Sequence, residues 1–399
     1  MNIRTTVAIV GAGPAGLLLG HLLASQGIDF VIMEARSREY ILSRIRAGVL
    51  EEASVEVLEK LGLDGRLKEH GLVHDGIYLQ YEGTRHHVDF HELIGRTVTV
   101  YGQQQVVNDL MLAHDELGSA VYFESSDLLP RNVETPRPSV RFTHEGTDYD
   151  VEADFVVGAD GFHGVCRTII PATAITSFER EFPFAWLGIL ANVAPSTDEL
   201  IYALHPDGFA MHSMRSPSVS RLYLQVDPDD DVANWSDERI WEGLHERLGI
   251  DGWTLHEGEI TEKSITPMRS FVASTLNYGA LFLVGDAGHI VPPTGAKGLN
   301  AAISDVAMLG AAFTSYYAGD AAPLSTYSDR ALRRQWKTQY FSRWMTEMLH
   351  TSGGAAKDRG TDAEFRYRGQ VGQLEFVTGS EYALQTLAEQ YTGLPIEGI

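Results

Sequence analysis

The chain has 399 residues, of which 44% are apolar, and its net charge is −23 because 54 acidic residues outnumber 31 basic ones. The length predicts about two to three domains, or one large domain with insertions, and the apolar content excludes a disordered chain. The negative charge argues against nucleic acid and anionic membranes as partners. The single cysteine, Cys166, excludes an intrachain disulfide and a zinc cluster of cysteines. It fits a reducing, cytoplasmic location, and we predict no metal site.

The first forty residues alternate between strand and helix patterns. We predict a buried strand, a glycine-rich turn, an amphipathic helix closed by Gly27 and a second strand, over residues 5–10, 11–16, 17–27 and 28–34. This βαβ unit predicts a parallel, doubly wound sheet. The spaced glycines argue against a signal peptide in this apolar stretch, and no other run is long enough to span a membrane.

The turn between that strand and helix carries a G-x-G-x-x-G motif, formed by Gly11, Gly13 and Gly16. The first glycine permits a tight turn, the second lets a pyrophosphate approach the backbone, and the third lets the helix pack on the strand. The helix N-terminus adds amide donors. Glu34 ends the next strand, where a carboxylate can bind a ribose hydroxyl. We therefore predict dinucleotide binding; the alternative is a tight strand–helix corner without a ligand.

The later patterns divide the chain further. Apolar runs at 154–161 and 280–288 predict strands that return to the first sheet, so the nucleotide-binding domain is discontinuous. Period-two alternation predicts an antiparallel sheet from segments 184–193, 199–206, 208–216 and 220–227. Helices are predicted over 236–248, capped by Ser236 or Asp237, and over 326–350.

The resulting fold class is α/β (α+β), with three parts. A discontinuous Rossmann-like domain with a parallel sheet covers 1–178 and is completed by about 266–300. An antiparallel-sheet substrate domain covers 179–290, and a helical region covers 291–399.

Asp286, at the end of the returning strand 280–288, is a second candidate ligand of the dinucleotide. Ligands of such sheets bind at the carboxyl ends of the strands, so Asp286 is placed to bind a second ribose; the alternative is a helix cap or turn residue. The following turn at Gly298, Leu299 and Asn300 aims helix amides at the electron-rich end of a flavin ring. Two separate returns of the chain favour FAD, the longer cofactor.

Together and in this order, the glycine motif, DGFHG (160–164) and GDAGHIVPPTGAKGLN (285–300) resemble the class A FAD-dependent aromatic hydroxylases. SRIRAGVLE (43–51), HSMRS (212–216), PMRSF (267–271) and YTGLP (391–395) extend the resemblance over nearly the whole chain. It implies an FAD-dependent monooxygenase that uses NAD(P)H and O2, through a flavin hydroperoxide, to convert 4-hydroxybenzoate to 3,4-dihydroxybenzoate. It also implies a homodimer.

The resemblance implies that Arg215 binds the carboxylate of the substrate, with help from Ser213 and Tyr223. A guanidinium group forms two parallel hydrogen bonds to a carboxylate, which suits a benzoate. Without the resemblance, Arg215 is interpreted as an exposed strand arginine.

The resemblance also implies a proton relay from the substrate phenol through Tyr202 and Tyr391 to His74 at the solvent end. An unperturbed phenol has a pKa of about 10, so its ionisation near neutrality needs help. The Pro293 carbonyl is implied to contact the substrate hydroxyl, with Thr294 beside it. From the residues alone, each tyrosine is more typical of an amphipathic core position.

Further cofactor contacts follow only from the resemblance. It implies that Arg44, Arg46 and Gln103 contact FAD, and that Tyr40, Arg44, His163 and Arg269 contact the nicotinamide coenzyme. Arg36 and Arg38 could pair with the 2′-phosphate that distinguishes NADPH from NADH. However, Ala35 stands where typical members of the family have an arginine. NADPH is therefore favoured as the coenzyme, and NADH stays open. Lys297 has two interpretations, stabilisation of reduced flavin or a solvated turn lysine.

Three alternative functions stay open. The first is hydroxylation of a related acid, such as 3-hydroxybenzoate, 4-aminobenzoate or a dihydroxybenzoate. The second is a flavin-binding oxidase or redox sensor, and the third is a structural nucleotide-binding module. Arg215 and the Tyr202–Tyr391 pair favour the para-hydroxyl substrate, because they bind opposite ends of the ring.

Overall fold

A computed structural model describes residues 1–44, 48–351 and 360–396. Its nucleotide-binding half is built on a six-stranded sheet of order β19-β20-β13-β2-β3-β9. The strands are β2 (Val7–Val10), β3 (Phe30–Met33), β9 (Val121–Tyr122), β13 (Phe155–Gly158), β19 (Asn277–Tyr278) and β20 (Leu281–Leu283). All neighbours are parallel except β19 and β20. The prediction of a discontinuous parallel sheet is therefore confirmed.

Three helices pack together beside this sheet. Helix α1 (Pro14–Ser25) connects β2 to β3 and contacts both α6 (Gln103–Leu117) and α9 (Gly298–Tyr317). Leu17, Leu18, Leu19 and Leu23 of α1 are almost fully buried, so the apolar stretch that could suggest a signal peptide is part of the core. No helix in the described parts of the chain has the length and apolarity needed to cross a bilayer.

The second large element is an eight-stranded sheet of order β21-β18-β14-β17-β16-β15-β6-β7. Its strands are β6 (Gly76–Tyr81), β7 (Thr84–Asp89), β14 (Ser177–Asn192), β15 (Leu200–Ala203), β16 (Ala210–Ser216), β17 (Val219–Val226), β18 (Glu259–Ala273) and β21 (His289–Ile290). The predicted antiparallel segments are confirmed in β14 to β17. Strands β6 and β15 pair in parallel, so the sheet is mixed.

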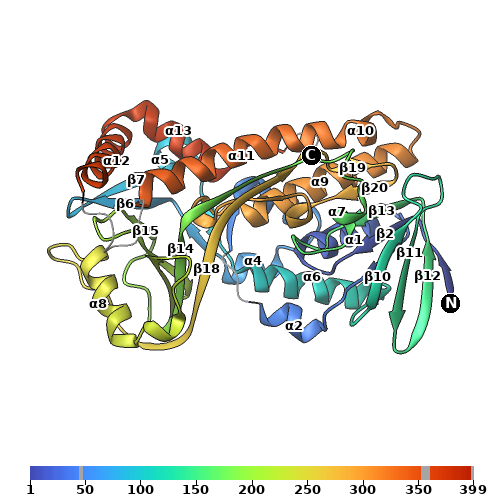
Figure 1. Ribbon diagram of the computed structural model, residues 1–399, viewed down its shortest axis with the longest axis horizontal. Coiled ribbons are helices and arrows are strands. Elements are labelled where there is room, and N and C mark those ends of the chain that lie inside the picture. Colours follow the sequence, from blue (N-terminus) through green and yellow to red (C-terminus); the bar gives the residue numbers. More distant parts are fainter. Residues whose placement is uncertain (45–47, 352–359, 397–399) are drawn as a thin grey trace.

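Two features tie this sheet to the rest of the molecule. Strands β14 and β18 pair along nearly their whole length and run from the substrate sheet toward the nucleotide-binding half (Figure 1). Strands β6 and β7 come from the segment predicted to belong only to the nucleotide-binding domain. The boundaries 1–178, 179–290 and 291–399 therefore stay a prediction, and the eight-stranded sheet contains strands from both sides of the first boundary.

Helix α8 (Asp237–Leu248) buries Ile240 and Leu244 against the sheet, and Ser236 caps it as predicted.

Two smaller sheets were not predicted. One has the order β1-β12-β11-β10 and contains β1 (Asn2–Arg4), β10 (Ser126–Arg131), β11 (Ser139–His144) and β12 (Thr147–Glu152). The other has the order β4-β8-β5 and contains β4 (Val49–Glu51), β5 (Leu72–His74) and β8 (Val98–Val100). Short helices α2 (Arg38–Ser43), α3 (Glu52–Lys60), α4 (Gly65–His70), α5 (Phe90–Ile94) and α7 (Cys166–Ile169) connect these parts.

The C-terminal region is helical, as predicted. It contains α10 (Ala322–Ser325), α11 (Tyr327–Leu349), α12 (Thr361–Gly379) and α13 (Glu381–Thr392). Helix α11 runs along both halves of the molecule, and α12 and α13 stand at its far end next to α5 (Figure 1). Helix α11 contacts α9 and the short turn η3 (Pro293–Gly295), and its Gln339 donates to the carbonyls of Phe271 in β18 and Ile290 in β21, so α11 connects these elements to the eight-stranded sheet.

Candidate active site

The glycine motif forms the corner between β2 and α1. A Cβ atom at Gly11 would overlap with the carbonyl of Ala159, and one at Gly16 would overlap with the carbonyl of Gly11. Gly13, the N-cap of α1, faces open space with nothing within 4 Å of such an atom. Two glycines are therefore required by packing, and the third leaves room beside the free amides of a helix N-terminus. That combination fits a pyrophosphate.

Glu34 lies just after β3 and is attached to this corner. Its carboxylate accepts hydrogen bonds from the amides of Ala12, at 2.7 Å, and Arg36, at 2.8 Å. The side chain is buried and fixed at the carboxyl end of a central strand, as the ribose role requires.

Asp286 lies in the turn η2 (Gly285–Ala287), at the carboxyl end of β20. Asp305 of α9 fixes this turn: its Oδ2 accepts from the Gly285 amide at 2.8 Å and from His289 Nε2 at 2.6 Å. Burial disfavours the charged form of His289, but the Asp305 carboxylate raises the His289 pKa above its ordinary value. Neither Asp305 nor His289 was singled out from the sequence, because neither belongs to the contacts that the family resemblance implies.

The start of α9 is joined to β4. Gly298 is its first residue, Leu299 is buried, and Asn300 donates to the Val49 carbonyl at 2.8 Å while accepting from the Glu51 amide at 2.9 Å. The Asn300 side chain therefore holds two segments about 250 residues apart in the sequence. The Gly298–Asn300 backbone remains the part of this turn available to a flavin.

Lys297 precedes α9, and its interpretation as a solvated turn lysine is wrong. Its side chain is only 4% exposed, and its Nζ donates to Glu51 Oε1 at 2.6 Å and to the Tyr391 carbonyl at 2.7 Å. Burial lowers the pKa of the ammonium group, and the Glu51 carboxylate acts in the opposite direction. Lys297 is thus a buried ion-pair partner rather than a solvated residue.

A cavity opens between the large sheet and the turn η3. Strand pairing sets Tyr202 beside Met211 and Met211 beside Tyr223, so side chains of β15, β16 and β17 line one wall. Alternation along β16 puts Met211 and Ser213 on the same face, and an irregular register between Met214 and Ser216 lets Met214 and Arg215 line the cavity as well. The lining residues are Gly48, Val49, Val100, Trp186, Leu200, Tyr202, Met211, Ser213, Met214, Arg215, Arg221, Tyr223, Pro293 and Ala296.

One end of this cavity is cationic. The Arg215 guanidinium contacts Gln104 Oε1, and a Cβ atom at Gly102 would overlap with it. Burial lowers the pKa of Arg215, and the nearby charge of Arg221 adds to this effect. Arg221, which the sequence did not suggest, lies over the Tyr223 ring at 5.2 Å from its centroid. Two partly buried cations at one end of a cavity form a site that favours an anion.

Another part of the cavity leads to a buried tyrosine pair. Tyr202 Oη and Tyr391 Oη lie 2.7 Å apart, and burial raises the pKa of both hydroxyls. Tyr202 and Pro293 line the cavity, whereas Tyr391 lies behind Tyr202. Thr294 is fully buried and accepts a hydrogen bond from Thr346 Oγ1 at 2.9 Å, so it fixes η3 to α11.

His74 is not at the surface. It lies in β5, only 2% exposed, and burial lowers its pKa to about 4. In the described ranges, no direct hydrogen bond joins it to either tyrosine, and both ring nitrogens lack a protein partner. Its place at the solvent end of a relay stays a prediction.

Trp186 forms a cavity wall that the sequence did not reveal. Its Nε1 donates to His350 Nε2 at 2.7 Å, and His350 Nδ1 lies 2.9 Å from the Thr346 carbonyl. Burial lowers the pKa of His350 to about 3, so the imidazole is neutral and serves as an acceptor. A contact between residues 164 positions apart leaves no local sequence signal.

The residues predicted for the nicotinamide coenzyme form two groups. In the first, the guanidinium groups of Arg36 and Arg44 lie 5.3 and 5.8 Å from the Tyr40 ring centroid. In the second, His163 and Arg269 both pack against the Phe162 ring. Arg46 lies outside the described residues, and Gln103 begins α6.

Arg38, the other candidate for a 2′-phosphate, is already engaged. Its two terminal nitrogens contact the two carboxylate oxygens of Asp115 at 2.7 and 2.6 Å. This pairing raises the pKa of Arg38 and lowers that of Asp115. A coenzyme phosphate would therefore compete with Asp115 for this guanidinium.

Comparison with known proteins assigns the family. Residues 4–342 match the family model described as an FAD binding domain. The chain is 48% identical to the p-hydroxybenzoate hydroxylase of Acinetobacter baylyi, over 99% of this chain and 97% of that protein. The chain belongs to the family of FAD-binding aromatic monooxygenases. The implied FAD cofactor agrees with the glycine corner, Glu34 and the turn that carries Asp286.

Other members of the FAD-binding monooxygenases are more distant. Pentachlorophenol 4-monooxygenase of Sphingobium chlorophenolicum is 25% identical over 80% of this chain and 60% of that protein. The crystal structure of p-nitrophenol 4-monooxygenase from Pseudomonas putida superposes with a TM-score of 0.78 at 16% identity, covering 99% of both chains. Anhydrotetracycline hydroxylase from Streptomyces rimosus has a TM-score of 0.73 at 20% identity, covering 98% of this chain and 76% of that one. These likenesses confirm the fold class.

Proposed function

We propose that this FAD-dependent monooxygenase hydroxylates 4-hydroxybenzoate at carbon 3, giving 3,4-dihydroxybenzoate, with NAD(P)H and O2 as co-substrates. The observation that carries the proposal is a cavity with the partly buried Arg215 on β16 and Tyr202 on the neighbouring strand β15, where Tyr202 forms a buried hydrogen bond to Tyr391 of α13. The 48% identity to a p-hydroxybenzoate hydroxylase along almost the full length supports the same substrate.

The two polar parts of the cavity are spaced for a para-substituted ring. Tyr202 lies beside Met211, and Arg215 follows four residues later on β16. Four residues of strand extend about 13 Å, so long side chains can reach in from both ends toward one aromatic acid. Arg215 would pair with the carboxylate, with Ser213 and Tyr223 beside it, and Tyr202 and the Pro293 carbonyl would meet the hydroxyl.

The protein's own chemistry would be proton removal from that hydroxyl. A phenolate attacks an electrophile more readily than a phenol, and Tyr202 Oη would accept the phenol's hydrogen bond while Tyr391 Oη carries the proton onward. His74 would take the next position. FAD, when bound and reduced, supplies the activation of O2. Gly11, Gly13, Glu34, Asp286 and the N-terminus of α9 would hold it.

The deciding experiment measures NADPH oxidation and products by chromatography, with 4-hydroxybenzoate, 3-hydroxybenzoate and 4-aminobenzoate in parallel. We expect 3,4-dihydroxybenzoate nearly equal to the NADPH consumed with the first acid only. Peroxide without this product would refute the proposal, and efficient turnover of another acid would favour the related-acid alternative. Arg215→Lys is the matched variant, because it keeps the charge but loses the two-point contact. It should raise the KM for the acid and leave FAD binding intact.

We also propose NADPH as the preferred coenzyme and a homodimer as the assembly. Arg36 and Arg44 beside Tyr40 support NADPH, whereas the commitment of Arg38 to Asp115 reduces the available charge. The ratio of kcat/KM for NADPH and NADH tests this preference. Exposed aromatic side chains on α12 and α13, namely Phe365, Phe376 and Tyr382, support an interface. Light scattering of the eluted holoenzyme gives its mass directly.

A further inference from the structure

The segment that follows α13 is held by basic side chains through its backbone carbonyls. Arg334 of α11 donates from Nη2 to the Leu394 carbonyl and from Nη1 to the Pro395 carbonyl, both at 2.7 Å. Arg96 donates to the Gly393 carbonyl at 3.0 Å. Lys297 donates to the Tyr391 carbonyl at 2.7 Å. Four of five consecutive carbonyls therefore accept hydrogen bonds from cations that come from three distant parts of the chain.

Carboxylates balance these charges and limit the position of the segment. Glu51 pairs with Lys297 at 2.6 Å and lies 3.9 Å from Arg334, and Glu52 lies 3.5 Å from Arg96. Gly393 has a φ of +96°, and a Cβ atom there would overlap with the Glu51 carboxylate. Only glycine thus fits at position 393. The Glu51 carboxylate limits the turn on one side, and Arg96 and Arg334 hold it through its carbonyls.

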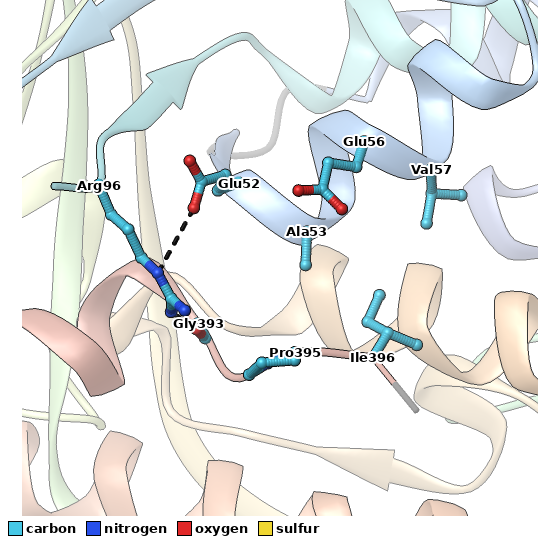
Figure 2. Close-up of a pocket in the computed structure, with 8 residues that line it drawn as sticks. All are labelled: Glu52, Ala53, Glu56, Val57, Arg96, Gly393, Pro395 and Ile396. Carbon is cyan, nitrogen blue, oxygen red and sulfur yellow. Dashed lines mark hydrogen bonds and ion pairs between the residues drawn. The ribbon is translucent and has the colours of Figure 1, made fainter. Parts of the chain in front are cut away.

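Figure 2 shows Arg96 reaching across Gly393 toward Glu52, with Pro395 and Ile396 facing Ala53, Glu56 and Val57 of α3. Residues 393–396 therefore lie along α3 and do not continue α13. The hollow between them contains two carboxylates and no feature that points to a ligand. Ile396 packs against the hydrophobic cluster that includes Val57, so apolar contacts add to the hydrogen bonds that hold this segment.

The held segment begins at the functional tyrosine. Tyr391 lies in the last turn of α13, where carbonyls have no partner within the helix and ends fray. Cations at a helix C-terminus satisfy those carbonyls and oppose the helix dipole. The same turn carries the Tyr391 hydroxyl that lies 2.7 Å from Tyr202 Oη. A small displacement of the turn would break this hydrogen bond, because its geometry tolerates only a few tenths of an ångström.

We infer that Arg334 is a positioning residue for the proton relay. By holding the Leu394 and Pro395 carbonyls, it fixes the end of α13 and keeps Tyr391 Oη against Tyr202 Oη. Arg334 does not touch the cavity, so it acts through Tyr391 and not on the substrate. This inference rests on the proposed role of the tyrosine pair in ionising the substrate.

The test measures the pKa of bound 4-hydroxybenzoate from its phenolate absorbance across pH, at saturating acid, in the FAD-loaded enzyme. The variants are Arg334→Gln, Arg334→Lys, Tyr391→Phe and the double variant Arg334→Gln/Tyr391→Phe. Arg333→Gln is the matched control, because Arg333 is exposed on the same helix. We expect Arg334→Gln to raise the pKa of the bound phenol by about one unit, a tenfold change in its ionisation constant. Arg334→Lys should give a smaller shift, and the control none.

Non-additivity separates positioning from a general structural effect. If Arg334 acts through Tyr391, the double variant should show the shift of Tyr391→Phe alone. A wild-type pKa in Arg334→Gln, together with a shifted pKa in Tyr391→Phe, would overturn the inference even if the melting temperature falls. If Tyr391→Phe itself leaves the pKa unchanged, the relay in the proposed function is wrong, and the role of Arg334 falls with it. Arg334→Lys gives the same readout if Arg334→Gln does not fold.

Discussion

Replacement of Lys297 by methionine tests the buried charge pair at the start of α9. The side chains of Lys297 and Glu51 are 4% and 6% exposed, and their charged atoms lie 2.6 Å apart. Removal of one partner from a buried ion pair costs about 3–5 kcal/mol, because the other charge stays buried without compensation. Arg334 lies 3.9 Å from Glu51 and shares its charge, so we expect the lower end, about 3 kcal/mol. The Tyr391 carbonyl loses a donor as well.

The assay is urea unfolding of the cofactor-free protein, followed by tryptophan fluorescence, so that FAD affinity does not enter the free energy. Lys337→Met is the matched control, because Lys337 is exposed on α11. The double variant Glu51→Gln/Lys297→Met removes both charges and should recover part of the loss. A loss below about 0.5 kcal/mol in Lys297→Met, as expected for an exposed substitution, would refute the buried-pair account.

Three further changes test other contacts. Tyr202→Phe removes the 2.7 Å hydrogen bond to Tyr391. The amount of 3,4-dihydroxybenzoate formed per NADPH oxidised should therefore fall at neutral pH, while NADPH oxidation persists. An unchanged ratio of product to NADPH would contradict the relay. Asp305→Asn weakens the fixation of η2, and FAD titration should show a Kd raised about tenfold, or roughly 1.4 kcal/mol. An unchanged Kd would mean that η2 holds its shape without Asp305. His350, with a folded-state pKa of about 3, stays neutral in the folded protein, so the unfolded chain binds a proton first as pH falls. Stability should therefore decline from about pH 6.5 downward by up to ~1.4 kcal/mol per unit, and His350→Gln should reduce this slope; an equal slope would exclude His350 as its source.

The parts of the fold predicted correctly are those set by local pattern. The β2–α1–β3 unit follows from apolar runs and from Gly11 and Gly16, which no larger residue can replace at that corner. Helix α8 begins where Ser236 accepts a hydrogen bond from the Arg239 amide, a signal confined to four residues. Pairings between distant segments were missed, and β6 beside β15 is the clearest case. Nothing within residues 76–81 indicates a partner at 200–203.

The same division applies to the candidate site. Tyr202 and Arg215 were named through the family resemblance, and the cavity brings them together with Ser213, Tyr223 and Pro293. Lys297 was misread because its partner, Glu51, is 246 positions away. A lysine in a glycine-rich turn is ordinarily solvated. Only the folded chain reveals the carboxylate whose pairing offsets the cost of burying the ammonium group.

The long pairing of β14 with β18 has a mechanical consequence. The two strands are hydrogen-bonded from Ser177 and Ala273 at one end to Asn192 and Glu259 at the other, with irregular register near Glu181 and Leu190. At about 3.3 Å per residue, this pair of strands is about 50 Å long. It forms a continuous antiparallel ladder between the nucleotide-binding half and the eight-stranded sheet. A twist applied at the cofactor end is therefore transmitted to the wall that carries Trp186. Rotation of one half against the other would have to break or bend this hydrogen-bonded ladder, so the amides of β14 and β18 should exchange with solvent among the slowest in the molecule.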